Sequence, residues 1–266
     1  IERERYYSAE KYFNQLLTFL DKNDYEVRAK VLNNLGYMAY RRGHYGKAHE
    51  FYMQSLNLYG DYFSNSDKLL ILLNLGNVFD TYEDTVSARL HYYRALGLSG
   101  DNKENKALVL HNIGVYHTAQ KKYDQALDCL TKSLELKEEI GDRKGIVHTL
   151  TSIGNLHKQR GEKKEARTYY RRARKQARGL GYIQGESQSI YNLGLLELEE
   201  KNYDSATDYF QEGMEQAKKL ENNFFGYLFN EGLGDIFSEQ DRLDLSTKYY
   251  NNAIEHAEQI RRGIGL

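Results

Sequence analysis

The chain has 266 residues, and 40% of them are hydrophobic, which is enough to bury a substantial core and excludes a disordered chain. It contains no proline, while the helix formers Leu, Glu, Lys, Ala and Gln are abundant, so we expect almost uninterrupted helix. Its 37 Lys and Arg residues nearly cancel its 38 Asp and Glu residues, which excludes a whole-chain electrostatic field that would hold nucleic acid or an anionic membrane.

The cysteine content and the lengths of the apolar runs further narrow the class of protein. Cys129 is the single cysteine, so no intramolecular disulfide can form, and we expect a reducing, cytoplasmic compartment. No stretch approaches the roughly 20 apolar residues of a membrane span, and no signal peptide opens the chain, so we expect no membrane partner. Because the chain begins at Ile1 and not at Met, we interpret it as part of a longer protein whose missing part holds the output activity.

The first predicted element is a helix at residues 2–20. Within it, Ala9, Phe13 and Leu16 have the spacing of the second helix of a helical hairpin. We therefore expect one extra helix that caps or continues the array that follows.

Beyond this helix, a Leu-Gly or Ile-Gly dipeptide recurs six times along the chain. The glycines are spaced by 40, 38, 40, 40 and 40 residues and are Gly36, Gly76, Gly114, Gly154, Gly194 and Gly234. Twelve residues after each stands a small residue: Ala48, Ala88, Ala126, Ala166, Ala206 and Ser246. Four positions further on stands a large residue: Tyr52, Tyr92, Leu130, Tyr170, Phe210 and Tyr250. Three more positions bring a second small residue: Ser55, Ala95, Ser133, Ala173, Gly213 and Ala253. This recurrence predicts six helical hairpins that share one packing scheme.

Packing between helices explains why glycine recurs at the same position of each repeat. A glycine in mid-helix costs about 0.5 to 1 kcal/mol relative to alanine, so six of them need a compensating gain. We expect a second helix to approach each glycine closely through its first small residue, while the large residue fills the gap to the next hairpin. Apolar residues such as Leu32 and Leu72 complete the helical stripe in five repeats, whereas the sixth repeat has Asn230 at that position.

Turn residues mark the ends of three second helices. In each Gly-Asp dipeptide, the glycine can adopt a left-handed conformation after the helix and the aspartate can cap the next helix. These dipeptides are Gly60-Asp61, Gly100-Asp101 and Gly141-Asp142.

This pattern of residues resembles the tetratricopeptide repeat family over about residues 27–262, although the usual tryptophan and closing proline of the family are absent. The 40-residue period resembles a long-repeat subclass found in cell-polarity adaptors and bacterial peptide-pheromone receptors. The resemblance implies an all-α, right-handed superhelical solenoid that forms a single domain over residues 1–266. Its parts would be an N-terminal helix at 1–26 and six repeats at about 27–66, 67–104, 105–144, 145–184, 185–224 and 225–262.

In the resembling family, the first helix of each hairpin lines a concave groove. The residues directly before the repeated Leu or Ile are Asn34, Asn74, Asn112, Ser152, Asn192 and Gly232. An amide side chain offers one acceptor and two donors, so a ladder of amides can hold the backbone of an extended peptide without reading its sequence. The alternative is that these amides only face solvent in an empty groove, although a solvated position would vary among Lys, Glu and Gln.

Specificity would then come from less regular neighbours on the same helices. We predict these contacts at Tyr37, Tyr40, Asn77, His111, His148, Asn155 and Tyr191, with Asn33 and Asp80 beside them. Some members of the family grip a terminal carboxylate with cations, and the corresponding positions here carry none: Asn33, Tyr37, Asn74, Leu108 and Asn112. A free terminal carboxylate is therefore not the expected ligand at that site.

The densest charge run spans residues 160–178, mostly on a predicted second helix. We interpret it as a solvated helix face, because no nucleic-acid module surrounds it; the alternative is a site for an acidic protein or nucleic acid. His117 and His157 fall where the family packs an aromatic side chain, so we expect them in the core. No zinc-binding spacing occurs, and we expect no metal or cofactor.

Enzyme signatures are absent from the sequence. The run Gly43-His44-Tyr45-Gly46-Lys47 is too short for a phosphate loop and lacks a preceding strand, and Cys129 is expected as a buried thiol. We therefore expect a non-enzymatic protein- or peptide-binding module that acts as an adaptor or as the sensor part of a larger regulator. The alternatives are a structural array that self-associates into a homo-oligomer, and the regulatory part of an enzyme or transcription factor whose active domain is absent.

Overall fold

The computed structural model describes residues 2–58 and 64–264, with side chains at residues 10–58 and 64–262. Every regular element within these residues is an α-helix, which confirms the predicted all-α class. Inter-residue contacts divide the chain into two compact units, residues 1–136 and 137–266.

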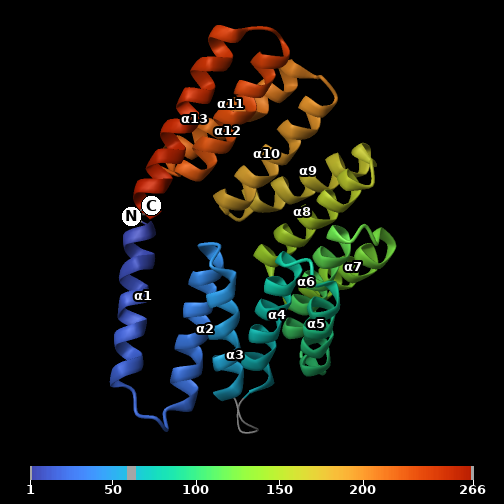
Figure 1. The fold of residues 1–266 in the computed structure, drawn as a ribbon. Helices are drawn as coiled ribbons and strands as arrows, with labels where there is room; N and C mark the ends of the chain where they lie inside the picture. Colours follow the sequence, from blue (N-terminus) through green and yellow to red (C-terminus); the bar gives the residue numbers. More distant parts are fainter. Residues whose placement is uncertain (1, 59–63, 265–266) are drawn as a thin grey trace. The chain divides into compact units, whose positions relative to one another are not determined.

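Each unit is built from pairs of helices joined by short turns (Figure 1). The first unit contains α1 (Glu2–Phe19), α2 (Tyr25–Arg41), α3 (Tyr45–Leu58), α4 (Asn65–Thr81), α5 (Thr85–Ser99) and α6 (Lys103–Ala119). Helix α7 (Tyr123–Ile140) begins in the first unit and ends in the second. The second unit continues with α8 (Arg143–Gln159), α9 (Lys163–Gly179), α10 (Ile183–Glu199), α11 (Tyr203–Lys219), α12 (Asn223–Glu239) and α13 (Leu243–Ile264).

Helix α1 is the extra N-terminal helix that the sequence predicts, and it packs against α2. The guanidinium of Arg28 in α2 donates to the carbonyl oxygens of Leu17 and Leu20 at 3.2 and 3.4 Å. Arg42 forms an ion pair with Glu10. The array therefore starts with a single helix that is held to the first hairpin by polar contacts.

Each of the six repeat glycines lies against the large residue of the second helix in its own hairpin. A Cβ atom on Gly154 would lie 2.5 Å from Cε1 of Tyr170. The prediction of a close approach at the glycines is confirmed, and the nearest atoms belong to the large residue. At Gly114 the backbone oxygen of the small residue Ala126 also lies 3.2 Å from the position of an added Cβ. The ring is the larger group, and it occupies the space that the missing side chain leaves. The large residue also reaches the next hairpin, as predicted, since the ring centroids of Tyr92 and Tyr116 are 5.2 Å apart.

The small residues keep the two helices of a hairpin close together. All members of the first small position are buried. At the second small position, the hydroxyls of Ser55 and Ser133 donate to the carbonyl oxygens of Ala29 and Ala107, each at 2.7 Å. A one-carbon side chain thus reaches the backbone of the partner helix, which a bulkier residue would push away.

In the Gly-Asp turns, both described glycines have the predicted positive φ, but only one of the two aspartates caps the next helix. Gly141 has a φ of 71°, and Asp142 accepts a hydrogen bond from the backbone N–H three residues on, at 2.9 Å. Gly100 has a φ of 50°, but the residue that caps α6 is Asn102 and not Asp101. The reason is that this linker is one residue longer. The dipeptide at 60–61 lies outside the described residues.

The sixth repeat accommodates Asn230 in place of an apolar residue. Asn230 is only 3% exposed, and its Nδ2 donates to the carbonyl oxygen of Gly226 at 2.8 Å. Its Oδ1 accepts from Asn252 at 3.4 Å. Internal hydrogen bonds therefore satisfy the buried amide and keep the sixth hairpin in the common scheme.

We expect Gly154→Ala to destabilise the protein by about 1 to 3 kcal/mol, because the added methyl group collides with the Tyr170 ring. The control is Gly97→Ala in α5, where an added Cβ meets no atom within 4 Å. This change should be neutral or stabilise by up to about 1 kcal/mol, since alanine favours helix. Chemical denaturation followed by circular dichroism measures both. A Gly154→Ala variant as stable as the wild type would contradict the packing scheme.

Candidate functional site

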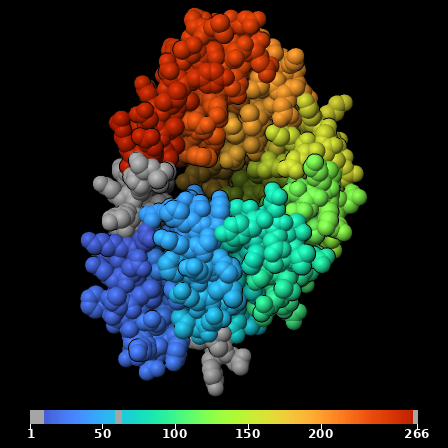
Figure 2. All heavy atoms as spheres, in the orientation of Figure 1, coloured from blue at the N-terminus to red at the C-terminus, as the bar shows by residue number. Residues whose placement is uncertain are grey.

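The predicted binding residues of the first unit lie on its three first helices, α2, α4 and α6. These helices are neighbours, and polar contacts join them: Nδ2 of Asn74 donates to Oδ1 of Asn33 at 3.1 Å, and Nδ2 of Asn105 donates to Oγ of Ser66 at 2.8 Å. In the space-filling view, the surfaces of the first two hairpins adjoin one another (Figure 2). We call the surface of α2, α4 and α6 the first-helix face.

Three amides of the predicted ladder lie on this face. Asn34 is exposed and makes no side-chain hydrogen bond within the described part of the chain. Asn74 and Asn112 are half-buried, and each uses its Nδ2 inside the protein, on Asn33 and on the carbonyl oxygen of Leu108 at 2.9 Å. No donor to either Oδ1 is present among the described residues, so both oxygens are placed to accept.

Aromatic and imidazole side chains stand beside these amides. Tyr37 is 42% exposed, and its hydroxyl accepts from Arg41 at 2.9 Å. Tyr40 is half-buried, with its hydroxyl 3.3 Å from that of Thr81 in the next hairpin, and His111 is half-buried as well. These side chains lie on the same helices as the amides, and their role as specificity contacts stays a prediction.

Two other predicted contacts, Asn77 and Asn155, are hydrogen-bonded within their own hairpins. The hydroxyl of Tyr92 donates to Oδ1 of Asn77 at 2.6 Å, and that of Tyr170 donates to Oδ1 of Asn155 at 2.7 Å. The same arrangement recurs in the sixth hairpin, where Tyr250 donates to Asp235 at 2.7 Å. The position after the repeat glycine thus supplies an acceptor for a buried phenol, which is a structural role that sequence reasoning missed.

The signal for this pairing is present in the sequence. Hairpins three and five carry Leu130 and Phe210 at the large position, which have no hydroxyl, and there the residue after the glycine is Val115 or Leu195. An amide or carboxylate therefore follows the glycine in three of the four hairpins that have a tyrosine at the large position, the exception being Tyr37 opposite Tyr52.

In the second unit, the ladder residue Asn192 is buried. It is 8% exposed, its Oδ1 accepts from Gln188 at 3.3 Å, and its Nδ2 has no acceptor among the described residues. Tyr191 packs against Phe210 and Phe229 with centroid distances of 5.9 and 6.0 Å, and burial raises its pKa to about 12. Asn192 is therefore enclosed, whereas Tyr191 is half-buried between two phenylalanine rings.

His148 belongs to a polar cluster near the start of the second unit. Its Nε2 lies 3.1 Å from the hydroxyl of Tyr182. Nearby, the buried Lys137 donates from Nζ to Oγ1 of Thr149 at 2.9 Å. Burial lowers the pKa of Lys137 to about 8, although the Asp142 carboxylate opposes the shift. Desolvation and the ammonium of Lys137 lower the pKa of His148.

The basic run at residues 160–178 is paired to a large extent, which corrects its interpretation as a solvated face. Helix α9 packs beside α10, and glutamates of α10 and α11 meet its arginines. These ion pairs are Arg167 with Glu197 and Glu200, Arg174 with Glu212, and Arg178 with Glu186 and Glu212. Exposed cations such as Arg171 and Lys175 fit the solvated interpretation. Most arginines of α9 therefore form ion pairs that link this helix to the following ones.

Three residues predicted in the core are partly or fully enclosed. His117 and His157 are 4% and 8% exposed, which confirms the prediction. Cys129 is half-buried, less than predicted, and burial raises the pKa of its thiol.

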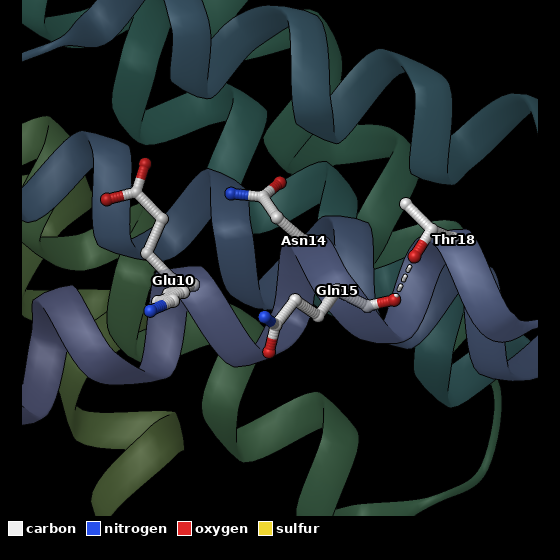
Figure 3. A pocket seen from close by; sticks show the side chains of 5 residues that line it. Glu10, Asn14, Gln15 and Thr18 are labelled. Atoms are coloured by element: carbon white, nitrogen blue, oxygen red, sulfur yellow. Dashed lines mark hydrogen bonds between the residues drawn. The ribbon is translucent and has the colours of Figure 1, made fainter.

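A hollow on α1 is lined by the polar side chains of Glu10, Lys11, Asn14, Gln15 and Thr18 (Figure 3). The hydroxyl of Thr18 donates to the carbonyl oxygen of Gln15 at 2.6 Å. All five residues come from one helix outside the repeats, so this hollow lacks the amides that converge from successive hairpins.

The described residues contain neither a metal-binding cluster nor a helix that could cross a membrane. No group of three or more His, Cys, Asp or Glu side chains among them is placed to hold a metal ion. None of the helices in this part of the chain combines the length and apolar character that a membrane crossing requires.

The fold and the glycine crossings define a helical-hairpin repeat protein. Two models of the tetratricopeptide repeat match the sequence, one over residues 28–61 and the other over residues 105–179. The chain belongs to the tetratricopeptide repeat family. No curated protein matches the sequence.

Solved structures share the fold at low identity. RapI in its apo form is 19% identical, with a TM-score of 0.63 over 88% of this chain and 99% of that one. A Rap protein complexed with competence and sporulation factor is 14% identical, with a TM-score of 0.70 over 94% and 80%. Yeast Tom70 is 14% identical, with a TM-score of 0.71 over 98% and 48%. At these identities the likeness establishes a shared helical solenoid.

Removing the acceptor of a buried phenol should destabilise its hairpin. We expect Asn77→Leu to cost about 1 to 3 kcal/mol, because Tyr92 is 2% exposed and its hydroxyl loses its partner. Adding Tyr92→Phe should recover most of the loss, since the pair then copies Leu195 with Phe210. Denaturant unfolding of the single and double variants measures this coupling. A double variant no more stable than Asn77→Leu would refute the pairing.

Replacing the buried ammonium should stabilise the second unit at neutral pH. Below pH 8 Lys137 is protonated in both states and is desolvated only in the folded one, so Lys137→Met should gain about 1 to 3 kcal/mol at pH 7. Between about pH 8 and its ordinary value of 10.5, the folded wild type releases the proton and becomes more stable, so the gain should shrink.

Stability curves at pH 7 and pH 10 measure this difference. The exposed Lys132→Met in the same helix is the control and should change stability by less than about 0.5 kcal/mol at either pH. A gain for Lys137→Met that does not depend on pH would contradict the assignment.

Proposed function

We propose that the chain is a non-enzymatic module that binds a protein or peptide partner, and that its first-helix face holds an extended segment of that partner. The observation that carries this proposal is the set of amides Asn34, Asn74 and Asn112, which recur at one repeat position on three neighbouring helices. Asn34 is exposed, and the other two direct their donors inward and keep an acceptor for a ligand N–H group.

The spacing of packed helices suits an extended backbone. Neighbouring helices pack about 8 to 10 Å apart, and an extended chain rises about 3.3 Å per residue. Successive amides would therefore meet the ligand about every third residue. Backbone contacts alone are blind to sequence, so Tyr37, Tyr40 and His111 would select among ligands.

Membership of the tetratricopeptide repeat family supports a binding role, and the similar Rap structure was determined with competence and sporulation factor bound to that protein. We propose that the module acts as an adaptor or as the sensor part of a larger regulator. In the second unit Asn192 is buried, so the proposed amide contacts are those of residues 1–136.

We expect Asn74→Ala with Asn112→Ala to weaken every bound peptide. Two lost hydrogen bonds of about 0.5 to 1.5 kcal/mol each reduce affinity roughly 5- to 150-fold. Ligands would be captured from native lysate on immobilised wild type, identified, and resynthesised as peptides for calorimetry. Tyr37→Ala should instead change which of these peptides binds best.

The matched control is Asn57→Ala, an exposed asparagine on the second helix α3, which should bind as the wild type does. If the double variant binds every peptide with unchanged affinity, the first-helix face is not the recognition surface. A mass that rises with concentration, together with that result, would favour the self-association alternative.

A further inference from the structure

Asp80 lies near the C-terminal end of α4, where the first-helix face draws on three successive hairpins. Its carboxylate is half-buried and hydrogen-bonds with the side chain of Gln120, at the end of α6. On the other side, Tyr40 of α2 contacts Thr81, the residue that follows Asp80. The site therefore has one carboxylate, one amide and an aromatic ring, each from a different repeat.

The hydroxyl groups around Asp80 are committed to other acceptors. Tyr92 donates to Oδ1 of Asn77 at 2.6 Å, and Tyr116 donates to the carbonyl oxygen of Thr85 at 3.0 Å. Both tyrosines are close enough for the Asp80 charge to raise their pKa values further after burial has raised them. Burial also raises the pKa of Asp80 itself, and the hydrogen bond with Gln120 opposes this shift without cancelling it.

Enclosed carboxylates elsewhere in the protein are compensated by stronger donors. Glu186 and Glu197 are 8% and 7% exposed, and they pair with Arg178 and Arg167. Burial alone would raise the pKa of Glu197. Its hydrogen bonds and its ion pair with Arg167 outweigh this effect, so the pKa is lowered. Half-buried Asp235 accepts from the phenol of Tyr250 at 2.7 Å.

Asp80 lacks a charged partner of this kind. No Lys, Arg or His among the described residues forms an ion pair with it. A partly desolvated carboxylate that has only a neutral amide for a partner keeps much of its capacity to bind a cation. Tyr40 meets the adjacent residue Thr81 through its hydroxyl, so the rim of this site is also polar on the side of α2.

We propose that Asp80 is an anionic subsite for a cationic group, a guanidinium or an ammonium, of the polypeptide held along the first-helix face. The inference rests on the proposed function and names a property of the ligand, which is a basic group near this end of α2, α4 and α6. Gln120 orients the carboxylate. The cation would provide the charge compensation that Arg167 and Arg178 provide to buried glutamates elsewhere in the chain.

The test uses the full chain and a phage-displayed library of random dodecapeptides. The wild type should enrich peptides with Lys or Arg at a fixed place in the consensus. Asp80→Asn, which keeps a similar shape and an acceptor for Gln120, should enrich peptides without that preference. Glu50→Gln, an exposed carboxylate on the second helix α3, is the matched control and should enrich the wild-type consensus.

Synthetic versions of the enriched peptides then locate the cation by calorimetry. Replacing the basic residue by citrulline or norleucine should weaken wild-type binding on the order of tenfold or more, because hydrogen bonds to charged groups are the stronger class. Acetylation of the peptide N-terminus should have that effect instead if the cation is the terminal ammonium. Asp80→Asn should bind the charged and neutral peptides about equally.

The outcomes separate the two proposals. If the wild type enriches peptides whose affinity is unchanged by removal of every positive charge, the assignment of Asp80 is overturned while the proposed function stands. If the wild type enriches no peptide at all, both are overturned. The comparison of charged and neutral peptides on the wild type decides the matter even if Asp80→Asn folds poorly.

Discussion

The fold depends on one repeated contact, in which a large side chain of the second helix lies on a glycine of the first. Any side chain at these glycines would overlap the ring, since an added Cβ would lie 2.6 Å or less from the nearest atom of the opposing side chain. The contact fixes how closely the helices approach, and buried alanines keep that distance along the rest of the hairpin. The same ring reaches the next hairpin, so the packing within a repeat also determines the packing between repeats.

Placing a tyrosine on a glycine creates a second requirement, because its hydroxyl is buried with its ring. The second, fourth and sixth hairpins meet it with Asn77, Asn155 and Asp235, each fifteen residues before its tyrosine. Asparagines on the first helices therefore have two roles. Those directly after the glycine support the hairpin, whereas those two positions before it face outward in the first unit. Residue type alone does not separate these roles, and only the hydrogen-bond partner does.

The architecture was predictable because it repeats. A single glycine in a helix says little, but six at nearly one spacing, each followed by a small and then a large residue, leave few ways to pack. The polar contacts were not predictable to the same degree. Asn74 meets Asn33 across 41 residues, and Arg167 meets Glu197 across 30, and neither pairing has a sequence signature. Asn192 shares its repeat position with Asn74 but is buried, and nothing in the repeat pattern distinguishes the two.

The distribution of charge separates the surface that holds the array together from the surface that is left for a ligand. On α9 the arginines point toward the following hairpins and meet glutamates there, so their charge is neutralised inside the second unit. The side chains that we propose to contact a ligand on the first-helix face are amides, phenols and an imidazole, with the half-buried carboxylate of Asp80 beside them. Long-range attraction between such a surface and a charged partner is weak, because neutral groups project no field. Recognition on this face must therefore be local, through hydrogen bonds to a backbone that has already been brought within reach, and a single buried charge then discriminates more sharply than an exposed one.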